Sequence, residues 1–313
     1  MVITGRSAHK GKGLVNKMKK MFGLSVMVSL LLVMSACGAP KSLPSAGVSV
    51  QEEATEPGDT ALILPEGKTL ETRFATPKGY TRTPAGENSL ATFLREYGLK
   101  DADAPLLLYD GTKKPRQDVH AAIFTLPVTE RDLQQCADSV IRVWAEYYYQ
   151  TGQYEKIRFH FTNGFLCDYS KWIQGYRVQI NGNEVSWEKR GAYDDSYGSF
   201  ENYLNTVFCY AGTLSLDTYD TVSVDLEDMD AGDMLLKGGS PGHVVMVVDV
   251  CENDQGKKAF LLGQGYMPAQ EFHVVKNPAH EEDPWYYEEE MTFPVKTAEY
   301  TFDDPGMIKR LNH

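Results

Sequence analysis

The sequence contains no CxxC pair, no P-loop and no Rossmann glycine pattern. Its 5 cysteines among 313 residues are too few for a small disulfide-stapled scaffold. Basic residues are outnumbered by acidic ones, 31 to 43, which argues against binding of nucleic-acid phosphates through a basic face. Hydrophobic residues make up 42% of the chain, too many for a disordered protein. What remains is a globular, acidic protein with a sizeable core.

The sequence also lacks a long apolar run, because the apolar segment near its start is short. Residues 21–36 are mostly apolar, but a membrane-spanning helix needs about 20 residues. Three lysines (Lys17, Lys19 and Lys20) precede this run, and residues 1–37 carry no acidic residue. A basic segment followed by a short apolar segment is typical of a secretory signal. Without it, the remaining 25 basic and 43 acidic residues give a net charge of −18.

The apolar run ends in Val33-Met34-Ser35-Ala36-Cys37, which resembles a bacterial lipobox although Met34 replaces the usual leucine. The resemblance implies a lipoprotein signal segment over residues 1–37, whose lipobox residue Cys37 becomes the lipidated N-terminus once the residues before it are removed. A soluble signal peptide and an anchor without lipid are the alternatives. Residues 38–60 are rich in Pro, Gly, Ser and Glu and predict a flexible tether. We therefore expect a lipid-anchored protein outside the cytoplasm, bound to the membrane through Cys37.

Residues 61–313 predict a single α+β domain, with helices early and antiparallel strands later. Apolar spacing favours helices over 88–98, 130–152 and 199–214, with Thr129 as the cap of the second helix. The turn Asn181-Gly182-Asn183 between apolar segments predicts a hairpin over 176–188. Further strands are expected over 106–109, 119–126, 157–161, 233–236, 243–251, 259–264 and 272–275.

Cys136 is the first candidate for chemistry, because it lies in the first or second turn of the long predicted helix. The positive end of the helix dipole lowers the pKa of a thiol there and increases the thiolate fraction. The alternative is a buried cysteine that acts as a small hydrophobic residue.

His243 and Gln264 are the second and third candidates. A Gly/Pro-rich turn delivers His243 to the start of an apolar strand, where an imidazole suits a general base. Gln264 ends the next apolar strand between two glycines, and its amide could orient the imidazole. A histidine that caps the turn and a glutamine that faces solvent are the alternatives.

Aromatic residues offer weaker candidates for substrate binding. Trp172, Tyr266 and Trp285 could stack on sugar rings or line a cleft, although aromatic side chains most often belong to the core. His243, His273 and His280 lack the spacing of metal ligands, so we expect no metal and no cofactor. The remaining cysteines, Cys167, Cys209 and Cys251, could pair after export, which spacing does not decide.

Taken together, Cys136, Gly232-Asp233, Gly242-His243 and Gln264 resemble the papain-like NlpC and CHAP groups of cell-wall amidases and peptidases. The resemblance covers about residues 130–276 and implies a helix carrying cysteine packed on an antiparallel sheet. It also implies that Gln134 or Gln135, with the backbone N–H of Cys136, stabilises an oxyanion. The chain departs from these groups in the long separation of Cys136 from His243, which implies an inserted hairpin and helix over 157–214.

A longer resemblance covers almost the whole predicted domain. The segments QDVHAAIF (117–124), RDLQQCADSVIR (131–142), FTNGFLCDYSKWIQGYR (161–177), GGSPGHVVMVVDV (238–250) and LLGQGYMPAQEFHVVKNP (261–278) resemble a bacterial lipoprotein family, domain of unknown function 4846. This resemblance implies a secreted or surface lipoprotein and no particular reaction.

Two functions stay open at this point. The first is a cysteine hydrolase that cleaves amide bonds of the cell envelope, in peptidoglycan or in an envelope peptide. The second is a non-catalytic envelope protein that binds a glycan or a protein partner. Proximity of Cys136 to His243 beside an open cleft would favour the first.

Overall fold

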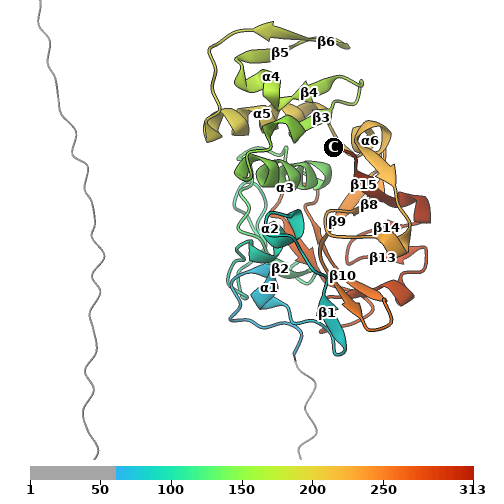
Figure 1. Ribbon diagram of the computed structural model, residues 1–313. Coiled ribbons are helices and arrows are strands. Elements are labelled where there is room, and N and C mark those ends of the chain that lie inside the picture. The colour runs from blue at the N-terminus through green and yellow to red at the C-terminus, as the bar shows by residue number, and fades with distance from the viewer. Residues whose placement is uncertain (1–60) are drawn as a thin grey trace, which may run out of the picture. The chain divides into compact units, whose positions relative to one another are not determined.

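The computed structural model of the chain describes residues 61–313 (Figure 1). The predicted signal peptide, Cys37 and the tether lie outside the described residues. The helices are α1 (Leu70–Arg73), α2 (Leu90–Glu96), α3 (Cys136–Gln150), α4 (Tyr169–Ile173), α5 (Tyr197–Tyr210) and α6 (Thr213–Ser215). Within residues 61–313, every helix is too short or too polar to cross a bilayer.

A nine-stranded sheet dominates this part of the chain, with the order β2-β11-β10-β9-β8-β15-β7 and with β1 and β12 beside β9 and β10. All of its paired strands are antiparallel, so the α+β class is confirmed. The strands of this sheet are β1 (Tyr80–Arg82), β2 (His120–Ile123), β7 (Thr221–Ser223), β8 (Met234–Lys237), β9 (His243–Asn253), β10 (Lys258–Gln264), β11 (His273–Val275), β12 (Tyr286–Tyr287) and β15 (Ile308–Leu311).

Three two-stranded ladders complete the strands. The predicted hairpin is present, and its turn residue Gly182 has a φ of 61°, a backbone conformation that favours glycine. The ladders pair β3 (Arg158–His160) with β4 (Leu166–Asp168), β5 (Tyr176–Asn181) with β6 (Glu184–Lys189), and β13 (Val295–Lys296) with β14 (Thr301–Phe302).

Strand β9 is buried on both faces of the sheet. Val244, Met246 and Val248 join the core cluster that includes the apolar residues of α3. Val245 and Val247 point to the opposite face, where they join a second cluster with C-terminal residues such as Phe302. A strand covered on both sides needs a continuous apolar run, which is what the sequence provides at this position.

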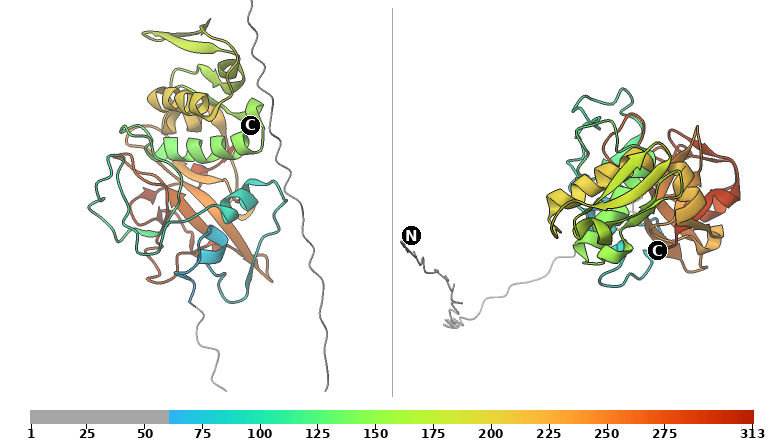
Figure 2. Two further views of the ribbon diagram at one scale, coloured as in Figure 1. Left: turned by 90° about the vertical axis from the view of Figure 1, so that its left-hand side faces the viewer. Right: turned by 90° about the horizontal axis from the view of Figure 1, so that it is seen from above.

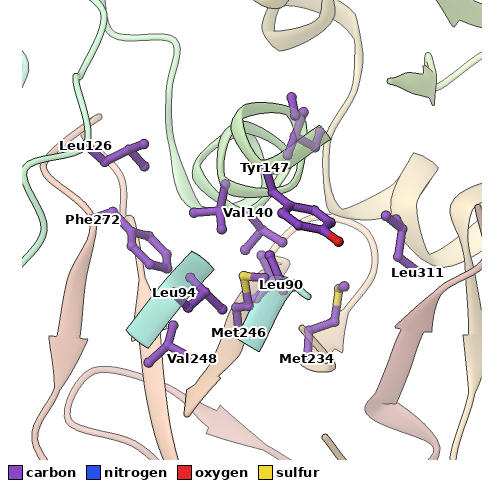
Figure 3. Close-up of a cluster of buried hydrophobic side chains, with 14 of the residues drawn as sticks. Leu90, Leu94, Leu126, Val140, Tyr147, Met234, Met246, Val248, Phe272 and Leu311 are labelled. Carbon is purple, nitrogen blue, oxygen red and sulfur yellow. The ribbon is translucent and has the colours of Figure 1, made fainter. Parts of the chain in front are cut away.

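Helix α3 lies between the sheet and the layer formed by α4, α5 and the β5–β6 hairpin (Figures 1 and 2). Val140 and Tyr147 of α3 belong to one core cluster with Met246 and Val248 of β9 and Leu94 of α2 (Figure 3). Burial of side chains of this size contributes about 1.5–3 kcal/mol each. The helix is therefore held on two sides, and its first residue has a fixed position.

Helix α3 begins later than the sequence predicts, which is a correction. It starts at Cys136 rather than near residue 130, and Gln135 rather than Thr129 occupies the cap position. The carboxyl of Asp138 accepts a hydrogen bond from the backbone N–H of Gln135 at 3.1 Å and so ends the preceding turns. Cys136 is therefore the first helical residue, where its backbone N–H has no partner within the helix.

Two other predicted elements also differ from the structure. The predicted strand over 106–109 is wrong, because Leu107 and Leu108 form only isolated bridges. Helix α5 ends at Tyr210 and the chain turns before α6, so the predicted helix over 199–214 is too long. The strands expected over 157–161, 233–236, 243–251, 259–264 and 272–275 are present with small shifts at their ends.

Candidate active site

A cavity of about 580 Å³ opens at the N-terminus of α3. Its walls come from segments far apart in the sequence: the first turn of α3, the Gly/Pro turn before β9, the segment after β10, and the connection between α5 and α6. Cys136, His243 and Tyr266 are among its lining residues. The volume lies in the range of sites that take small molecules or short peptide segments.

The thiol of Cys136 faces the start of β9. The backbone N–H groups of Cys136, Ala137 and Val244 all act on this thiol, and each lowers its pKa. Val244 directly follows His243, so the thiol lies beside the histidine's own strand end. Burial has the larger effect, however, and together with the nearby carboxyl of Asp138 it raises the pKa of Cys136 to about 11. This direction is opposite to the one that the helix dipole alone predicts.

Asp138 lines the same cavity and is almost fully buried. One carboxyl oxygen accepts the Gln135 N–H, and the other, Oδ1, has no hydrogen-bond partner among the described residues. Burial of a charge with so little compensation raises the pKa of Asp138 to about 8. Close to neutral pH, this carboxyl is therefore largely protonated.

The imidazole of His243 is held by one hydrogen bond and three aromatic rings. Its Nε2 atom lies 2.8 Å from Oε1 of Gln264. The rings of Tyr266, Tyr300 and Phe302 lie 4.8, 4.7 and 6.2 Å from the imidazole centre. Burial lowers the pKa of His243 to about 4, although the bond to Gln264 acts in the other direction. The ring is thus neutral and restrained at physiological pH.

No hydrogen bond joins Cys136 to His243 within residues 61–313. Both residues line one cavity, and the thiol lies beside the backbone of Val244, the residue after His243. With pKa values near 11 and 4, the two groups are a neutral thiol and a neutral imidazole. Neither group is charged near neutral pH, so the two residues do not form an ion pair there.

Gln264 connects His243 to a buried polar network that the sequence does not indicate. Its Nε2 atom lies 2.8 Å from Oε2 of Glu299, and that oxygen lies 2.7 Å from Nζ of Lys114. Side chains of Lys114 and Glu299 are only 8% and 6% exposed. Glu299 belongs to the short connection between β13 and β14, and no local motif marks either residue.

The other predicted residues fall into two groups. Gln135 lines the cavity, with its amide donating to Asp132 at 3.1 Å, whereas Gln134 is buried and donates to the carbonyl of Pro127. Of the two, Gln135 is thus the one placed to meet a ligand. Trp172 and Trp285 lie away from this cavity.

The two tryptophans are occupied by contacts of the fold. The Arg177 guanidinium covers the ring of Trp172 at 4.1 Å, and the Trp172 indole N–H donates to Ser199. Trp285 is fully buried and donates to the carbonyl of Ala75 at 2.9 Å. Trp285 is therefore enclosed by the fold, whereas Trp172 lines a separate cavity of about 540 Å³ away from Cys136.

The cysteines of the described segment, Cys136, Cys167, Cys209 and Cys251, are all free thiols. Cys167 and Cys251 are buried and Cys209 is exposed. Within residues 61–313 no cluster of three His, Cys, Asp or Glu side chains could hold a metal ion.

We compared the chain with known protein families. The family model described as domain of unknown function 4846 matches residues 70–309. The chain belongs to this family. The matched region contains Cys136, His243, Gln264, Glu299 and Lys114, so the whole cavity and its network are part of the family's domain. No curated protein and no solved structure matches the chain.

Proposed function

We propose that the chain is a papain-like cysteine hydrolase, an amidase or peptidase that cleaves amide bonds of the cell envelope. One observation carries the proposal: a cysteine that begins a helix shares a cavity with a histidine whose Nε2 is held by Gln264. Nucleophile, base and orienting group are the parts that acyl transfer through a thioester requires. The packing of α3 against an antiparallel sheet supports the papain-like relationship.

The reaction follows from these positions. Sγ of Cys136 attacks the amide carbonyl carbon while the thiol proton passes to Nδ1 of His243. The carbonyl oxygen becomes an oxyanion that the backbone N–H of Cys136 and the side chain of Gln135 can stabilise. The imidazolium then gives its proton to the amine nitrogen as the carbonyl re-forms and the C–N bond breaks, which leaves a thioester on Cys136. Water, deprotonated by His243, hydrolyses the thioester and restores the thiol.

The pKa values of the free protein determine at which step the thiol proton moves to His243. A thiol with a pKa of about 11 and an imidazole with a pKa of about 4 do not form an ion pair in the free protein. Proton transfer must therefore accompany attack on a bound substrate that brings Sγ and Nδ1 together. An enzyme of this kind is protected from oxidation between turnovers, because the thiolate is the reactive form.

The chemistry is tested by release of free amino groups from peptidoglycan fragments. The full chain is expected to release them, and Cys136→Ser and His243→Gln are expected to abolish release. Cys209→Ser is the matched control, because it removes an exposed thiol outside the site. Release that survives Cys136→Ser, or no release by the unaltered chain, would reject the hydrolase.

Alkylation gives a second readout that does not depend on the choice of substrate. In a Cys209→Ser background, iodoacetamide should label Cys136 slowly near neutral pH and faster as the pH approaches 11. The exposed Cys209 has to be removed because it would otherwise dominate the reaction. His243→Gln should slow the labelling of Cys136 further if the imidazole accepts the thiol proton.

The second candidate is a non-catalytic envelope protein that binds a glycan or a protein partner. The neutral resting pair and the missing hydrogen bond between Cys136 and His243 favour it. It predicts that peptidoglycan fragments bind with equal affinity to the unaltered chain and to Cys136→Ser, without release of amines.

We also propose that lipid on Cys37 anchors the protein to the membrane, facing away from the cytoplasm. The lipobox-like segment before Cys37 and the polar linker over 38–60 support this proposal. Incorporation of labelled palmitate should be lost in Cys37→Ser and kept in Cys209→Ser. Equal labelling of both variants would reject the anchor.

A further inference from the structure

The polar network behind His243 contains one atom whose hydrogen is unambiguous. Nδ1 of His273 lies 3.0 Å from the backbone carbonyl oxygen of Glu271. A carbonyl oxygen only accepts hydrogen bonds, so Nδ1 of His273 carries the hydrogen. Because His273 is fully buried and its pKa is lowered to about 3, its ring is neutral. Its Nε2 atom is therefore a lone-pair acceptor.

Gln264 lies between this acceptor and a second one. Its Nε2 atom is 2.8 Å from the carboxyl of Glu299 and 3.4 Å from Nε2 of His273. Both neighbours accept, and only the NH₂ end of an amide can donate to them. The two amide hydrogens of Gln264 are thus donated to Glu299 and His273, and its oxygen has to face the opposite side.

The opposite side is His243. Its Nε2 atom lies 2.8 Å from Oε1 of Gln264, and an amide oxygen only accepts. Nε2 of His243 therefore carries the hydrogen, and Nδ1 carries the lone pair. Nδ1 makes no hydrogen bond to any residue of 61–313, and the histidine lines the cavity with Cys136.

Lys114 contacts Glu299, the member of the network that is farther from His243 than Gln264 is. Its Nζ atom lies 2.7 Å from the same Glu299 oxygen that receives the Gln264 amide, and 4.8 Å from the centre of the Tyr266 ring. The ammonium supplies the counter-charge that a carboxylate in this buried position requires. The ion pair thereby keeps an acceptor at one fixed point beside Gln264.

We propose that Glu299 and His273 are positioning residues that lock the Gln264 amide in one orientation and so fix His243 as the Nε2–H tautomer. Neither residue touches the reacting atoms. They act through Gln264, and the result is a lone pair on Nδ1 of His243 on the side left for Cys136. The inference deepens the proposed hydrolase, since a base with the hydrogen on Nδ1 could not accept the thiol proton there.

The tautomer is measurable in the unaltered full chain without any assay of hydrolysis. With ¹⁵N-labelled histidine, two-bond ¹H–¹⁵N correlation spectra distinguish a nitrogen that carries hydrogen from one with a lone pair. The His243 signals are assigned by their loss in His243→Gln. The expected result near neutral pH is hydrogen on Nε2 of His243 and on Nδ1 of His273. Hydrogen on Nδ1 of His243 would overturn the proposal.

A double variant tests the cause. Glu299→Gln with Lys114→Met removes both charges together, so no buried ammonium stays unpaired. A glutamine at 299 can present its oxygen or its NH₂ group, and the Gln264 amide then has two arrangements. We expect mixed tautomers of His243 in this variant. A His243 tautomer that stays unchanged in a folded double variant would remove Glu299 from the mechanism.

The matched control is Glu146→Gln with Arg142→Met, the same two kinds of change at a second buried ion pair on α3, joined at 2.7 Å. It should leave the His243 tautomer unchanged. If the unaltered chain shows Nε2–H but releases no amines, the positioning inference stands and the hydrolase fails. If it releases amines with hydrogen on Nδ1 of His243, the hydrolase stands and the positioning inference fails.

Discussion

The imidazole of His243 and the amide of Gln264 meet at 2.8 Å, Nε2 to Oε1, at adjacent strand ends of the sheet. Strand β9 begins with the histidine and β10 ends with the glutamine. Antiparallel pairing brings the start of β9 to the same edge of the sheet as the end of β10. The ladder between them ends at Gly263 opposite Met246, so the contact is made by side chains beyond the last paired residues. It is the relationship on which the proposed chemistry depends.

Gln264→Leu should reduce amide hydrolysis by roughly ten- to a hundredfold, corresponding to the about 1–3 kcal/mol of a lost buried hydrogen bond. The imidazole would lose its fixed orientation, while Cys136 stays in place. The measurement is kcat for release of amino groups. Gln270→Leu is the control, because Gln270 is equally buried and makes no hydrogen bond to His243. Equal losses in both variants would point to a general packing effect.

Asp138→Asn should change how stability depends on pH. The pKa of Asp138 is about 8 in the folded protein and about 3.8 when unfolded. The folded state therefore holds the proton more tightly, and this contribution is complete below about pH 4 and lost as the pH rises through 8. An asparagine has no such loss.

Urea unfolding at about pH 5, 7 and 9 measures the effect. The free energy of unfolding of Asp138→Asn relative to the unaltered chain should increase across this series. The variant should also lower the pKa of Cys136, because the charge of Asp138 raises it. A difference in stability that is independent of pH would contradict the assignment.

Gly265→Ala should displace the first turn of α3. A Cβ atom at Gly265 would lie 2.1 Å from Oγ and 2.7 Å from Cβ of Ser139, and 3.0 Å from the carbonyl oxygen of Gln135. This close approach seats the end of β10 against the helix that carries Cys136. We expect a lower melting temperature and slower hydrolysis, from overpacking of about 1–3 kcal/mol.

Ser139→Gly provides the matching test, because it removes the two atoms that Gly265→Ala would strike. The double variant should regain part of the lost activity and stability. Losses that simply add in the double variant would show that the steric contact between these two positions is not the cause.

Asp249→Ala should destabilise the fold without touching the site. This carboxyl is fully buried and accepts from Arg82 and Arg95, each at 2.7 Å. Its removal leaves two guanidinium groups without their counter-charge, at a cost of about 3–5 kcal/mol. Chemical unfolding measures the loss. Asp101→Ala, which breaks only an exposed pair with Lys68, should leave the unfolding midpoint nearly unchanged.

Local sequence patterns determined much of the scaffold. The apolar run from residue 243 predicts a strand, and the structure contains β9 there, buried on both faces. The Asn181-Gly182-Asn183 turn predicts its hairpin, because only a few residue types accept the required backbone conformation. These features depend on neighbours within a few positions, which one sequence contains in full.

The start of α3 shows where local reasoning is incomplete. Apolar spacing extends the helix back to residue 130, but the carboxyl of Asp138 ends the preceding turns at Gln135. The spacing Gln135-x-x-Asp138 is visible in the sequence and could have been used. The raised pKa of Cys136 could not, because it comes from burial by segments far along the chain.

By itself, the sequence determined an acidic α+β domain behind a signal-like start, and it marked Cys136, His243 and Gln264 by residue type and local context. Only the tertiary structure decided that Glu299, Lys114 and His273 stand behind Gln264 and that Trp172 and Trp285 belong to the fold. The physical reason is that hydrogen-bond partners and desolvation depend on which distant segments meet. Sheet pairing and the packing of α3 determine these contacts between distant segments. The periodicity of a single segment contains no information about them.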